Sequence, residues 1–537
     1  MDNYLTETYG RPFLDYVLAT SNHGHINDLT DGQKATLKLL HNVAEAVDTE
    51  DGKDLRRVHI IHRISGYLPE HNCSVAALLR MQSGGEIPEP HHGDPLVDCM
   101  WRLARDAWPS FLIPQDENWP AFFGAMGALT FTHPAGNEAW NRILQDDSLK
   151  KLFPEYSDDP DSRGEVTEIQ SSVLTSAGRG GTFQLVSLPD LILSHARMRQ
   201  LIQNELSFES FLSAVAAIIA DWRRLAIGRQ ARTPVLVGFA GITLEREVNL
   251  PQGRLRKRSE ADRLLFGRQP GLGREVSVVL ETTHAFKILK VAPAKEMLSN
   301  NGMTNIWKGL ESKFEESRKQ LDHDIDMVRF SVLMASEPTS PMAMAVVSRA
   351  MLDMTQHGSS FGTHAVSFAP YGDVHIDSAR AEKIEHWARE VKDKHPGKLT
   401  LGARRLVSAV STRTDPLDGL IDAIICWENM VGTDMETSFR VCGALACLLE
   451  PESGEERTKR FKELKSLYDT RSKLVHGSRE PSYIEAQEYR SQAVGYALRA
   501  MQQLYRFPDL LSEPESAVRG TKILLTYDLS IKGSRQR

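Results

Sequence analysis

The sequence DPLDGLIDAIICWENMVG, Asp415–Gly432, decides the fold of the C-terminal part of this 537-residue chain, because it carries the marks of one complete helix. Asp415 is suited to cap the free backbone amides at the start, and Pro416 suits the first helical position. Gly432 is expected to end the helix. Apolar side chains between these ends recur at helical spacing and predict one buried stripe, formed by Leu417, Leu420, Ile421, Ile424 and Ile425.

The segments that follow continue the helical pattern. Residues Glu436–Glu450 are expected to form a second helix, which begins with a capping box of Thr433 and Glu436. Ser482–Tyr505 supplies a long last helix. The small side chains of the second helix allow a neighbour to approach closely, and they are Cys442, Gly443, Ala444, Ala446 and Cys447. A third segment carries the core residues Phe461, Leu464, Leu467 and Leu474. The sequence therefore predicts an all-α bundle of the four-helix type.

Within this bundle, the residues YDTRSKLVHG, Tyr468–Gly477, contain Arg471 and His476 with four residues between them. An RNA strand breaks when its 2′-OH attacks the adjacent phosphodiester, so an enzyme has only to move protons and to stabilise charge on the phosphorane. Histidine titrates near pH ~6.5 and suits proton transfer. Arginine stays protonated and presents a planar set of donors to phosphate oxygens. This pair is therefore suited to cut RNA without a metal ion.

The spacing alone is poor evidence, because an arginine followed by a histidine after four or five residues also occurs at Arg57/His62, Arg318/His323, Arg380/His386 and Arg389/His395. The setting distinguishes the pair at 471 and 476: a tyrosine lies three residues before the arginine, a serine follows it, and apolar residues precede the histidine. Together with the two upstream helices, this string resembles the signature of HEPN-domain ribonucleases. The closest resemblance is to the Apea-like HEPN branch, which is associated with bacterial anti-phage and abortive-infection systems.

This resemblance covers about the last quarter of the chain and implies a four-helix HEPN fold. It implies a metal-independent endoribonuclease without a cofactor, whose products carry 2′,3′-cyclic phosphate and 5′-OH ends. On a regular helix, Arg471 and His476 would lie about 140° apart, so either the helix begins or breaks near the motif or two motifs share one site. The resemblance implies the shared site as well, in a homodimer or in a pseudo-dimer with another helical part of the chain. The expected partner is RNA, with tRNA one candidate, and a phage-derived or small-molecule trigger is a further expectation.

The resemblance also implies roles for individual residues. His476 would act as general base or acid at the 2′-OH or the 5′-oxygen, and Arg471 would bind the scissile phosphate. Ser472 would hydrogen-bond RNA or orient the histidine. Glu428 and Arg440 occupy positions that often carry charge in the resembling sequences.

Each of these residues also has a purely structural interpretation. The histidine would cap carbonyls at a helix end, and Arg471 would pair with Asp469 or Glu480. Glu428 and Arg440 would form an ion pair across helices. For the whole domain, the alternative is a catalytically silent HEPN module that serves as a dimerising scaffold or a ligand sensor.

The rest of the chain predicts further domains, because 537 residues exceed what one hydrophobic core usually serves. Residues 1–230 are interpreted as a mainly helical sensor or regulatory region. Residues 231–400 predict an α+β domain with a small sheet, and residues 401–537 the HEPN domain, so the fold class is multidomain α+β. The clearest elements are a helix at Ser207–Leu225, strands near Val235–Glu245, Glu275–Leu289 and Asp373–Ile376, and helices at His323–Ser336 and Arg380–Lys394.

A basic run between the first two strands is a second place where RNA would bind. Its cations are able to grip phosphates, and they are Arg254, Arg256, Lys257 and Arg258. The simpler interpretation is a solvated hairpin or loop face. The net charge of −7 limits any RNA contact to a local site, because a protein that coats nucleic acid along its length is usually basic.

The composition and the apolar runs bear on the cellular compartment of the protein. The N-terminus lacks the basic start and apolar run of a signal peptide, and no apolar stretch reaches the ~20 residues of a membrane span, so a cytoplasmic protein is expected. The five cysteines form no CxxC pair and are interpreted as reduced thiols. A zinc site could draw its ligands from His71, Cys73, His91, His92 and Cys99. The preferred interpretation is a plain Pro-bounded loop, so no metal is expected.

Overall fold

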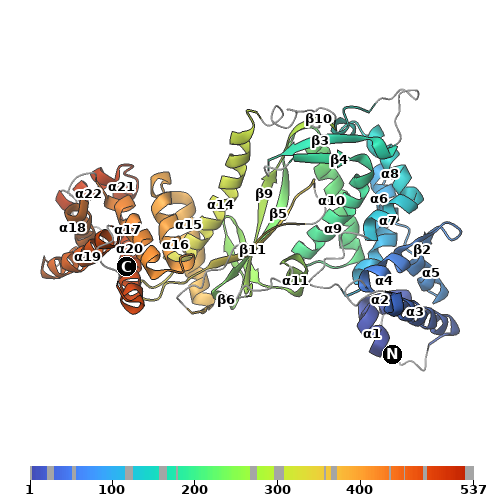
Figure 1. Cartoon of the computed structure of the whole chain (residues 1–537), viewed down its shortest axis with the longest axis horizontal. Helices are drawn as coiled ribbons and strands as arrows, with labels where there is room; N and C mark the ends of the chain where they lie inside the picture. The colour runs from blue at the N-terminus through green and yellow to red at the C-terminus, as the bar shows by residue number, and fades with distance from the viewer. Residues whose placement is uncertain are drawn as a thin grey trace.

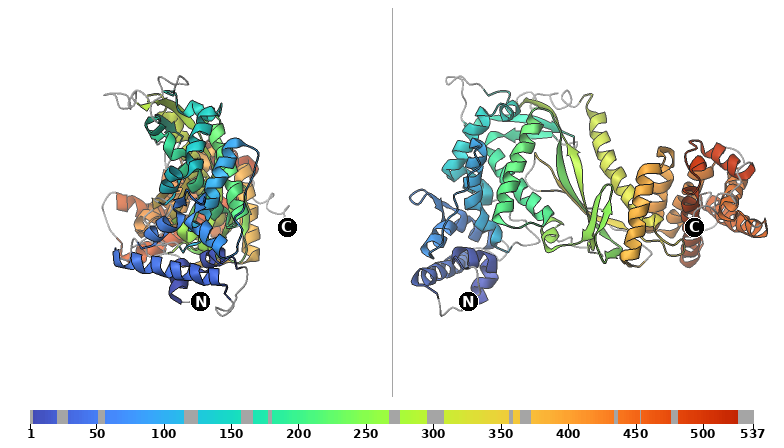
Figure 2. Two further views of the ribbon diagram at one scale, coloured as in Figure 1. Left: turned by 90° about the vertical axis from the view of Figure 1, so that its right-hand side faces the viewer. Right: turned by 180° about the vertical axis from the view of Figure 1, so that it is seen from behind.

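The computed structural model of the chain describes residues 3–20, 29–50, 56–114, 125–156, 166–176, 180–266, 275–294, 308–355, 359–363, 372–433, 437–452, 454–475 and 481–525. The molecule is elongated, with N-terminal helices at one end, the C-terminal helices at the other and the main sheet between them (Figures 1 and 2). The expected mixed α+β class is confirmed. No helix within the described ranges is long and apolar enough to cross a membrane.

The N-terminal region packs around two apolar cores. The first core joins short helices and one small hairpin, namely α1 (Asn3–Tyr9), α2 (Arg11–Val17), α3 (Asp31–Glu50), α4 (Arg56–Ser65), β1 (Tyr67–Leu68), β2 (Cys73–Ser74) and α5 (Val75–Gln82). The second core is larger and reaches the main sheet. Its elements are α6 (Pro95–Ala107), η2 (Trp108–Leu112), α7 (Ala125–Thr132), α8 (Pro134–Gln145), η4 (Leu149–Leu152), η6 (Val166–Glu168), β3 (Gln170–Thr175), β4 (Gly180–Gln184), η7 (Leu185–Ser187), α9 (Leu188–Gln203) and α10 (Phe208–Ala226).

Helix α10 forms as its sequence predicts. The Ser207 side chain accepts a hydrogen bond from the Ser210 amide at 3.1 Å, which caps the first turn. Its apolar stripe lies in the second N-terminal core, with Phe211 and Trp222 fully buried. The stripe therefore packs against the body of the protein.

The central sheet has six strands in the order β12-β11-β5-β9-β8-β7, and each neighbouring pair is antiparallel. The strands of this region are β5 (Ala231–Ala240), β6 (Ile242–Leu244), β7 (Val248–Leu250), β8 (Gly253–Lys257), β9 (Val278–Phe286), β10 (Ile288–Pro293), β11 (Ala345–Leu352), β12 (Ser359–Thr363) and β13 (Val374–Ile376), with α11 (Glu260–Phe266) after β8. Strand β10 pairs with β3 of the β10-β3-β4 sheet, and β13 pairs with β6. The predicted strands near 235–245, 275–289 and 373–376 are confirmed.

Both faces of the central sheet are covered, because side chains of β5 alternate between two cores. Leu236 and Ala240 lie in the N-terminal core with α9 and α10. Val235, Val237 and Phe239 lie in a separate core under two long helices, α14 (Glu311–Met334) and α15 (Ser378–Lys394). Figure 1 shows α14 running along this side of the sheet toward the C-terminal helices.

The C-terminal bundle has one continuous apolar core. It is built from α16 (Thr400–Ser411) after the short η8 (Gly397–Leu399), α17 (Pro416–Val431), α18 (Thr437–Leu449), α19 (Gly454–Val475), α20 (Tyr483–Leu504), α21 (Pro508–Leu511) and α22 (Ser516–Leu525). The four expected helices are α17 to α20, and α16 and α22 pack on α17 in addition. Helix α20 begins with a capping box of Ser482 and Glu485.

Helix α17 has the predicted ends. Asp415 accepts a hydrogen bond from the Leu417 amide at 2.8 Å, and Pro416 is the first helical residue. Gly432 follows the last residue but is extended, not left-handed, with φ −71°. A Cβ atom at this glycine would lie 2.3 Å from the Glu428 carbonyl oxygen, so close approach is the reason for glycine here. Glu436, the predicted partner in the cap of α18, lies outside the described residues.

The predicted buried stripe of α17 is only partly right. Leu420 and Ile424 are fully buried, whereas the other three members, Leu417, Ile421 and Ile425, are half-buried. The buried surface is wider because helices surround α17, and it includes Trp427, whose indole donates to the Ala493 carbonyl at 3.2 Å. Helix α17 is thus the central helix of the bundle.

Helix α14 joins the sheet to the bundle. Its residues Ile325, Val328 and Val332 lie in the core under the sheet, whereas Phe330 and Leu333 lie in the core of the bundle. One helix therefore supplies side chains to two cores from two of its faces.

Arg329 strengthens this junction from the same helix. Its Nε donates to the Met344 carbonyl at 2.9 Å, beside the sheet. Its Nη2 donates to Ser411 Oγ at 2.5 Å and Thr412 Oγ1 at 3.0 Å, at the end of α16. Asp326 Oδ1 lies 3.3 Å from Nη1, and burial lowers the pKa of the guanidinium.

We expect Arg329→Met to lower the free energy of unfolding by about 3 kcal/mol, because it breaks a buried charge pair and leaves hydrogen-bond acceptors unsatisfied. Arg404→Met is the matched control: Arg404 also contacts Asp326, at 3.2 Å, but its side chain is 61% exposed. This exposed pair should contribute less than about 1 kcal/mol. Thermal unfolding of both variants checks the difference, and equal losses would contradict it.

His395 provides a second contact between the helices over the sheet and the bundle. It follows α15, and its Nδ1 lies 2.7 Å from the Tyr505 hydroxyl at the end of α20. Burial raises the pKa of Tyr505, so this hydroxyl stays protonated and donates. Burial also lowers the pKa of His395 from 6.5 to about 4, with a smaller contribution from His323.

This shift predicts acid sensitivity. Because the folded pKa lies below the unfolded one, the neutral histidine stabilises the fold above pH ~6.5, and this contribution is lost as the pH falls toward ~4. Its size is about 3 kcal/mol. His395→Gln, which keeps an acceptor for Tyr505, should flatten the fall of the unfolding temperature over this pH range. His386 is exposed, so His386→Gln should leave this fall of the unfolding temperature unchanged. If both variants lose stability with pH in the same way, the acid sensitivity does not come from His395.

Candidate functional site

The C-terminal end of α19 faces the C-terminal part of α17, and three polar side chains meet there. The Tyr468 hydroxyl donates to Glu428 Oε1 at 2.6 Å. Arg471, one turn further along α19, has its Nη2 at 4.0 Å from Glu428 Oε2. Tyr468 and Arg471 are three residues apart and therefore share one helix face. One carboxylate thus contacts both residues of the motif.

The tyrosine of this cluster is protonated. Burial, and then the hydrogen bond to the Glu428 carboxylate, raise the pKa of Tyr468 well above its ordinary value of 10. The hydroxyl therefore remains protonated and acts as a donor. One Glu428 oxygen accepts from the tyrosine, and the other lies toward the arginine.

Arg471 is placed by Glu428 but not fully engaged by it. The separation of 4.0 Å is long for a charge-assisted hydrogen bond, which is usually about 2.7–2.9 Å. Its Nε is buried and has no hydrogen-bond partner among the residues that the structure describes. The side chain is 26% exposed. The shielded Nε is not open to a ligand, whereas Nη2 is not held by a short hydrogen bond to Glu428.

His476 lies outside the described residues, as do Gly477 and Glu480. The described part of α19 ends at Val475, directly before the histidine. Whether the histidine and Arg471 face one another stays a prediction. Ser472, the residue after Arg471, is half-buried on α19.

The remaining predicted residues of the motif are placed apart from this cluster. Arg440 on α18 donates to Thr521 Oγ1 on α22 at 2.6 Å and is not the partner of Glu428. The expected ion pair between Glu428 and Arg440 is therefore replaced by the contacts to Tyr468 and Arg471. Asp469, one alternative partner of Arg471, instead contacts Lys465 Nζ at 3.1 Å.

The basic run of the middle domain forms β8 and the residues just after it. Arg254 contacts Glu281 at 2.9 Å, and Arg256 contacts Asp262 at 2.6 Å, with only 9% of the Arg256 side chain exposed. Arg258 lies 3.3 Å from Glu275, and Lys257 is exposed. Carboxylates thus neutralise three of the four cations, and because Arg256 is buried, the run is not fully the solvated hairpin or loop face of the simpler interpretation.

The histidines and cysteines weighed as zinc ligands have other neighbours. His91 Nδ1 lies 3.3 Å from Asp98 Oδ1, and the ring of His92 packs on Trp101. Within the described ranges, no group of three or more His, Cys, Asp or Glu side chains is arranged to hold a metal ion. All five cysteines are free thiols, and four of them are buried. Burial raises the pKa of Cys426 and of Cys442 to about 12.

The hydroxyl of Tyr468 is the contact that sequence reasoning missed. Its position one turn before Arg471 was visible, but its partner is a carboxylate forty residues away that only the packing of α17 on α19 brings near. The small residues of α18 predicted the close approach of a neighbouring helix, but not this contact between α17 and α19.

Tyr468→Phe tests the cluster without removing its ring. We expect a loss of about 1–2 kcal/mol in the free energy of unfolding, because the half-buried Glu428 loses its donor. Asp469→Asn is the matched control on the same helix and breaks the more exposed pair with Lys465, at a cost below about 1 kcal/mol. Thermal unfolding measures the stability of both variants. A Tyr468→Phe variant as stable as the parent protein would show that the hydrogen bond does not stabilise the fold.

Comparison of the chain with protein-family models, with curated proteins and with solved structures gave no match in any of the three. The likeness of the C-terminal segments to HEPN ribonucleases therefore stays a prediction from the motif. The geometry around Arg471 is the structural observation that bears on it.

Proposed function

We propose that the C-terminal bundle is a HEPN-type endoribonuclease that cuts RNA without a metal ion. The observation that carries this proposal is the placement of Arg471, which is half-buried beside Glu428 while its Nη2, at 4.0 Å, makes no short hydrogen bond to that carboxylate. The structural alternative for this arginine, an ion pair with Asp469, is not seen, because Asp469 contacts Lys465. An arginine buried against apolar neighbours would favour a scaffold, and here the neighbours are polar.

The chemistry assigns a role to each group. His476 takes the proton of the 2′-OH, which forms a bond to phosphorus while the bond from phosphorus to the 5′-oxygen breaks. The 5′-oxygen then receives a proton, which leaves a 2′,3′-cyclic phosphate and a 5′-OH end. Arg471 stabilises the added negative charge on the phosphorane. Glu428 and Tyr468 position the arginine.

A homodimer with two motifs in one cleft is part of this proposal, and so is action on cytoplasmic RNA in anti-phage defence. The bundle exposes apolar side chains, with Tyr483 63% and Ile484 70% exposed at the start of α20, a few residues after the motif. The same exposure favours the second candidate function, a catalytically silent dimerising scaffold. The N-terminal region would regulate the nuclease or the scaffold, or direct it to its target.

The test is cleavage of labelled total RNA and tRNA by the full chain in EDTA. We expect Arg471→Ala and His476→Ala each to reduce cleavage at least about 100-fold, the usual loss for a transition-state donor or a general base. Glu428→Gln should cause a smaller loss, because it acts through Arg471.

Arg389→Ala and His386→Ala are matched controls, since both residues belong to accidental Arg/His spacings on the exposed face of α15. These variants should cut like the parent protein. Cleavage abolished by EDTA would point to a metal centre instead. Cleavage that survives in both the Arg471→Ala and His476→Ala variants would exclude this site.

A further inference from the structure

Helix α19 carries a row of lysines on the side that faces water. Lys459, Lys462 and Lys473 are exposed, and none of them forms an ion pair or a side-chain hydrogen bond with another described residue. Ser466 and Thr470 lie between the last two lysines, so the five residues recur every three or four positions and share one face of the helix. We call these five residues the lysine stripe.

Other cations of α19 are already paired with carboxylates. Arg460 contacts Glu463 at 2.5 Å, and Lys465 contacts Asp469 at 3.1 Å. These two carboxylates are the only acidic residues of the helix between the first and the last lysine of the stripe. The lysine stripe therefore has three positive charges that no carboxylate within its length neutralises.

A row of free lysines is unfavourable for the helix by itself. Exposed helix faces usually mix charges of both signs, because like charges three or four residues apart repel one another. Lys459 and Lys462 are such a pair, although the whole protein has a net charge of −7. A local excess of positive charge on an acidic protein is typical of a surface that contacts a polyanion. The free lysines thus favour a phosphate backbone as the ligand.

An exposed aromatic ring lies beside the stripe. Phe439 of α18 is 62% exposed, and its ring stands edge-on to the ring of Phe461 on α19, with 5.5 Å between the centroids. Phe461 directly precedes Lys462. Proteins bind single strands with this combination, because a base stacks on the ring while the cations contact phosphates. The bases of a single strand are free to stack in this way, whereas those of a duplex are not.

The stripe ends next to the candidate site. Helix α19 lies at the outer end of the bundle, away from the central sheet (Figure 1). Lys473 lies two residues beyond Arg471 in the sequence. Arg471 faces α17, so the stripe and the candidate site lie on different sides of α19 and meet at its C-terminal end. The helix rises about 21 Å from Lys459 to Lys473, which lets the lysines contact separate phosphates of one strand.

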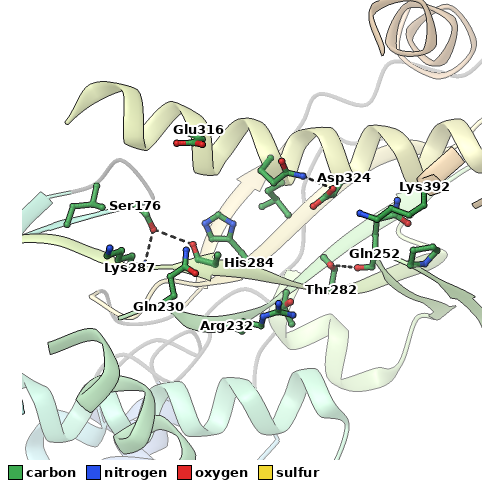
Figure 3. Close-up of a pocket in the computed structure, with 16 residues that line it drawn as sticks. Ser176, Gln230, Arg232, Gln252, Thr282, His284, Lys287, Glu316, Asp324 and Lys392 are labelled. Atoms are coloured by element: carbon green, nitrogen blue, oxygen red, sulfur yellow. Dashed lines mark hydrogen bonds between the residues drawn. The ribbon is translucent and has the colours of Figure 1, made fainter. Parts of the chain in front are cut away.

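Three cations in another part of the protein have a different setting. Arg232, Lys287 and Lys392 line a cavity of about 640 Å³ beside the central sheet, and none of them is paired with a described residue. Glu316 and Asp324 line the same cavity, and Lys392 lies on their side of it (Figure 3). The described lining of this cavity thus mixes charges of both signs and offers a polyanion no continuous cationic surface.

We propose that the lysine stripe binds the phosphate backbone of single-stranded RNA, with one base stacked on Phe439. The lysines contact phosphates without reading the sequence, because every nucleotide carries the same phosphate. The strand then continues over the C-terminal end of α19 to Arg471. This last step rests on the proposed nuclease function, whereas binding to the stripe does not.

Binding is measured on the full chain with a labelled 2′-O-methyl oligouridylate, by fluorescence anisotropy at several salt concentrations. The methyl group blocks the 2′-OH, so the probe cannot be cut and binding is separated from cleavage. We expect the triple variant Lys459→Gln, Lys462→Gln and Lys473→Gln to bind at least about ten-fold more weakly. The slope of log K against log salt should fall in magnitude by about 2, because each lost phosphate contact removes roughly 0.7 for a single strand.

The matched control removes the same charge from the cavity beside the sheet, through Arg232→Gln, Lys287→Gln and Lys392→Gln. This variant should keep the affinity and the salt slope of the parent protein. An equal loss in both triple variants would show that RNA responds only to the net charge, and would overturn the proposal. The absence of binding by the parent protein would overturn it as well.

Phe439→Leu tests the stacked base. It keeps an apolar contact with Phe461 but removes the flat ring, so binding should weaken about five-fold or more while the salt slope stays the same. Phe131→Leu is the matched control, because Phe131 is 51% exposed and stands edge-on to Trp140 in the N-terminal region. If Phe439→Leu binds RNA like the parent protein but sediments as a smaller species, this ring contacts a second copy of the chain and not a base.

Cleavage of unmodified RNA separates this proposal from the nuclease. If the triple lysine variant loses binding and no form of the chain cuts RNA, the lysine stripe stands and the nuclease is contradicted. If Arg471→Ala abolishes cleavage but the triple lysine variant binds and cuts like the parent protein, the nuclease stands and the lysine stripe is refuted.

Discussion

The fold depends on the position of α14, which is packed into two cores at once. One face of this helix covers the central sheet, and another completes the core of the C-terminal bundle. A helix that is apolar on more than one face has to be covered on each, so the sheet and the bundle cannot separate without exposing part of it to water. Arg329 adds polar contacts at the same junction, and its buried guanidinium requires both sides to be present.

A similar constraint holds the candidate site. Glu428 belongs to α17, the helix that the rest of the bundle surrounds, so its backbone is fixed by packing, and the Tyr468 hydroxyl holds its carboxylate. Tyr468 and Arg471 belong to α19, which lies nearer the edge of the bundle. The central helix therefore provides a fixed reference, and the outer helix carries the residues that would meet RNA. In the proposed site, a carboxylate on a firmly packed helix would keep the Arg471 guanidinium in one orientation.

The sequence predicted the helices of the bundle better than the strands of the sheet. Asp415 and Pro416 are local signals, because caps act within one turn of backbone. Strand β11 was not predicted, although its sequence AVVSRAML is rich in small and β-branched residues, because its partners β5 and β12 include one strand more than a hundred residues away. Strand β8 was expected only as a hairpin or loop, because its arginines interrupt the alternation of apolar and polar residues that predicts a strand. Their carboxylate partners, among them Glu281 and Asp262, come from later elements.

The state of the thiols has a consequence for the conditions in which the protein can work. The thiolate is the form that oxidants and disulfides attack, and burial keeps Cys426 and Cys442 protonated far above neutral pH. Cys73 and Cys99 are also buried, and burial raises the pKa of both thiols. Only Cys447 is partly accessible, and its pKa is raised as well. The five thiols should therefore stay reduced through an oxidative burst, and neither a disulfide nor a sulfenic acid is expected at these positions.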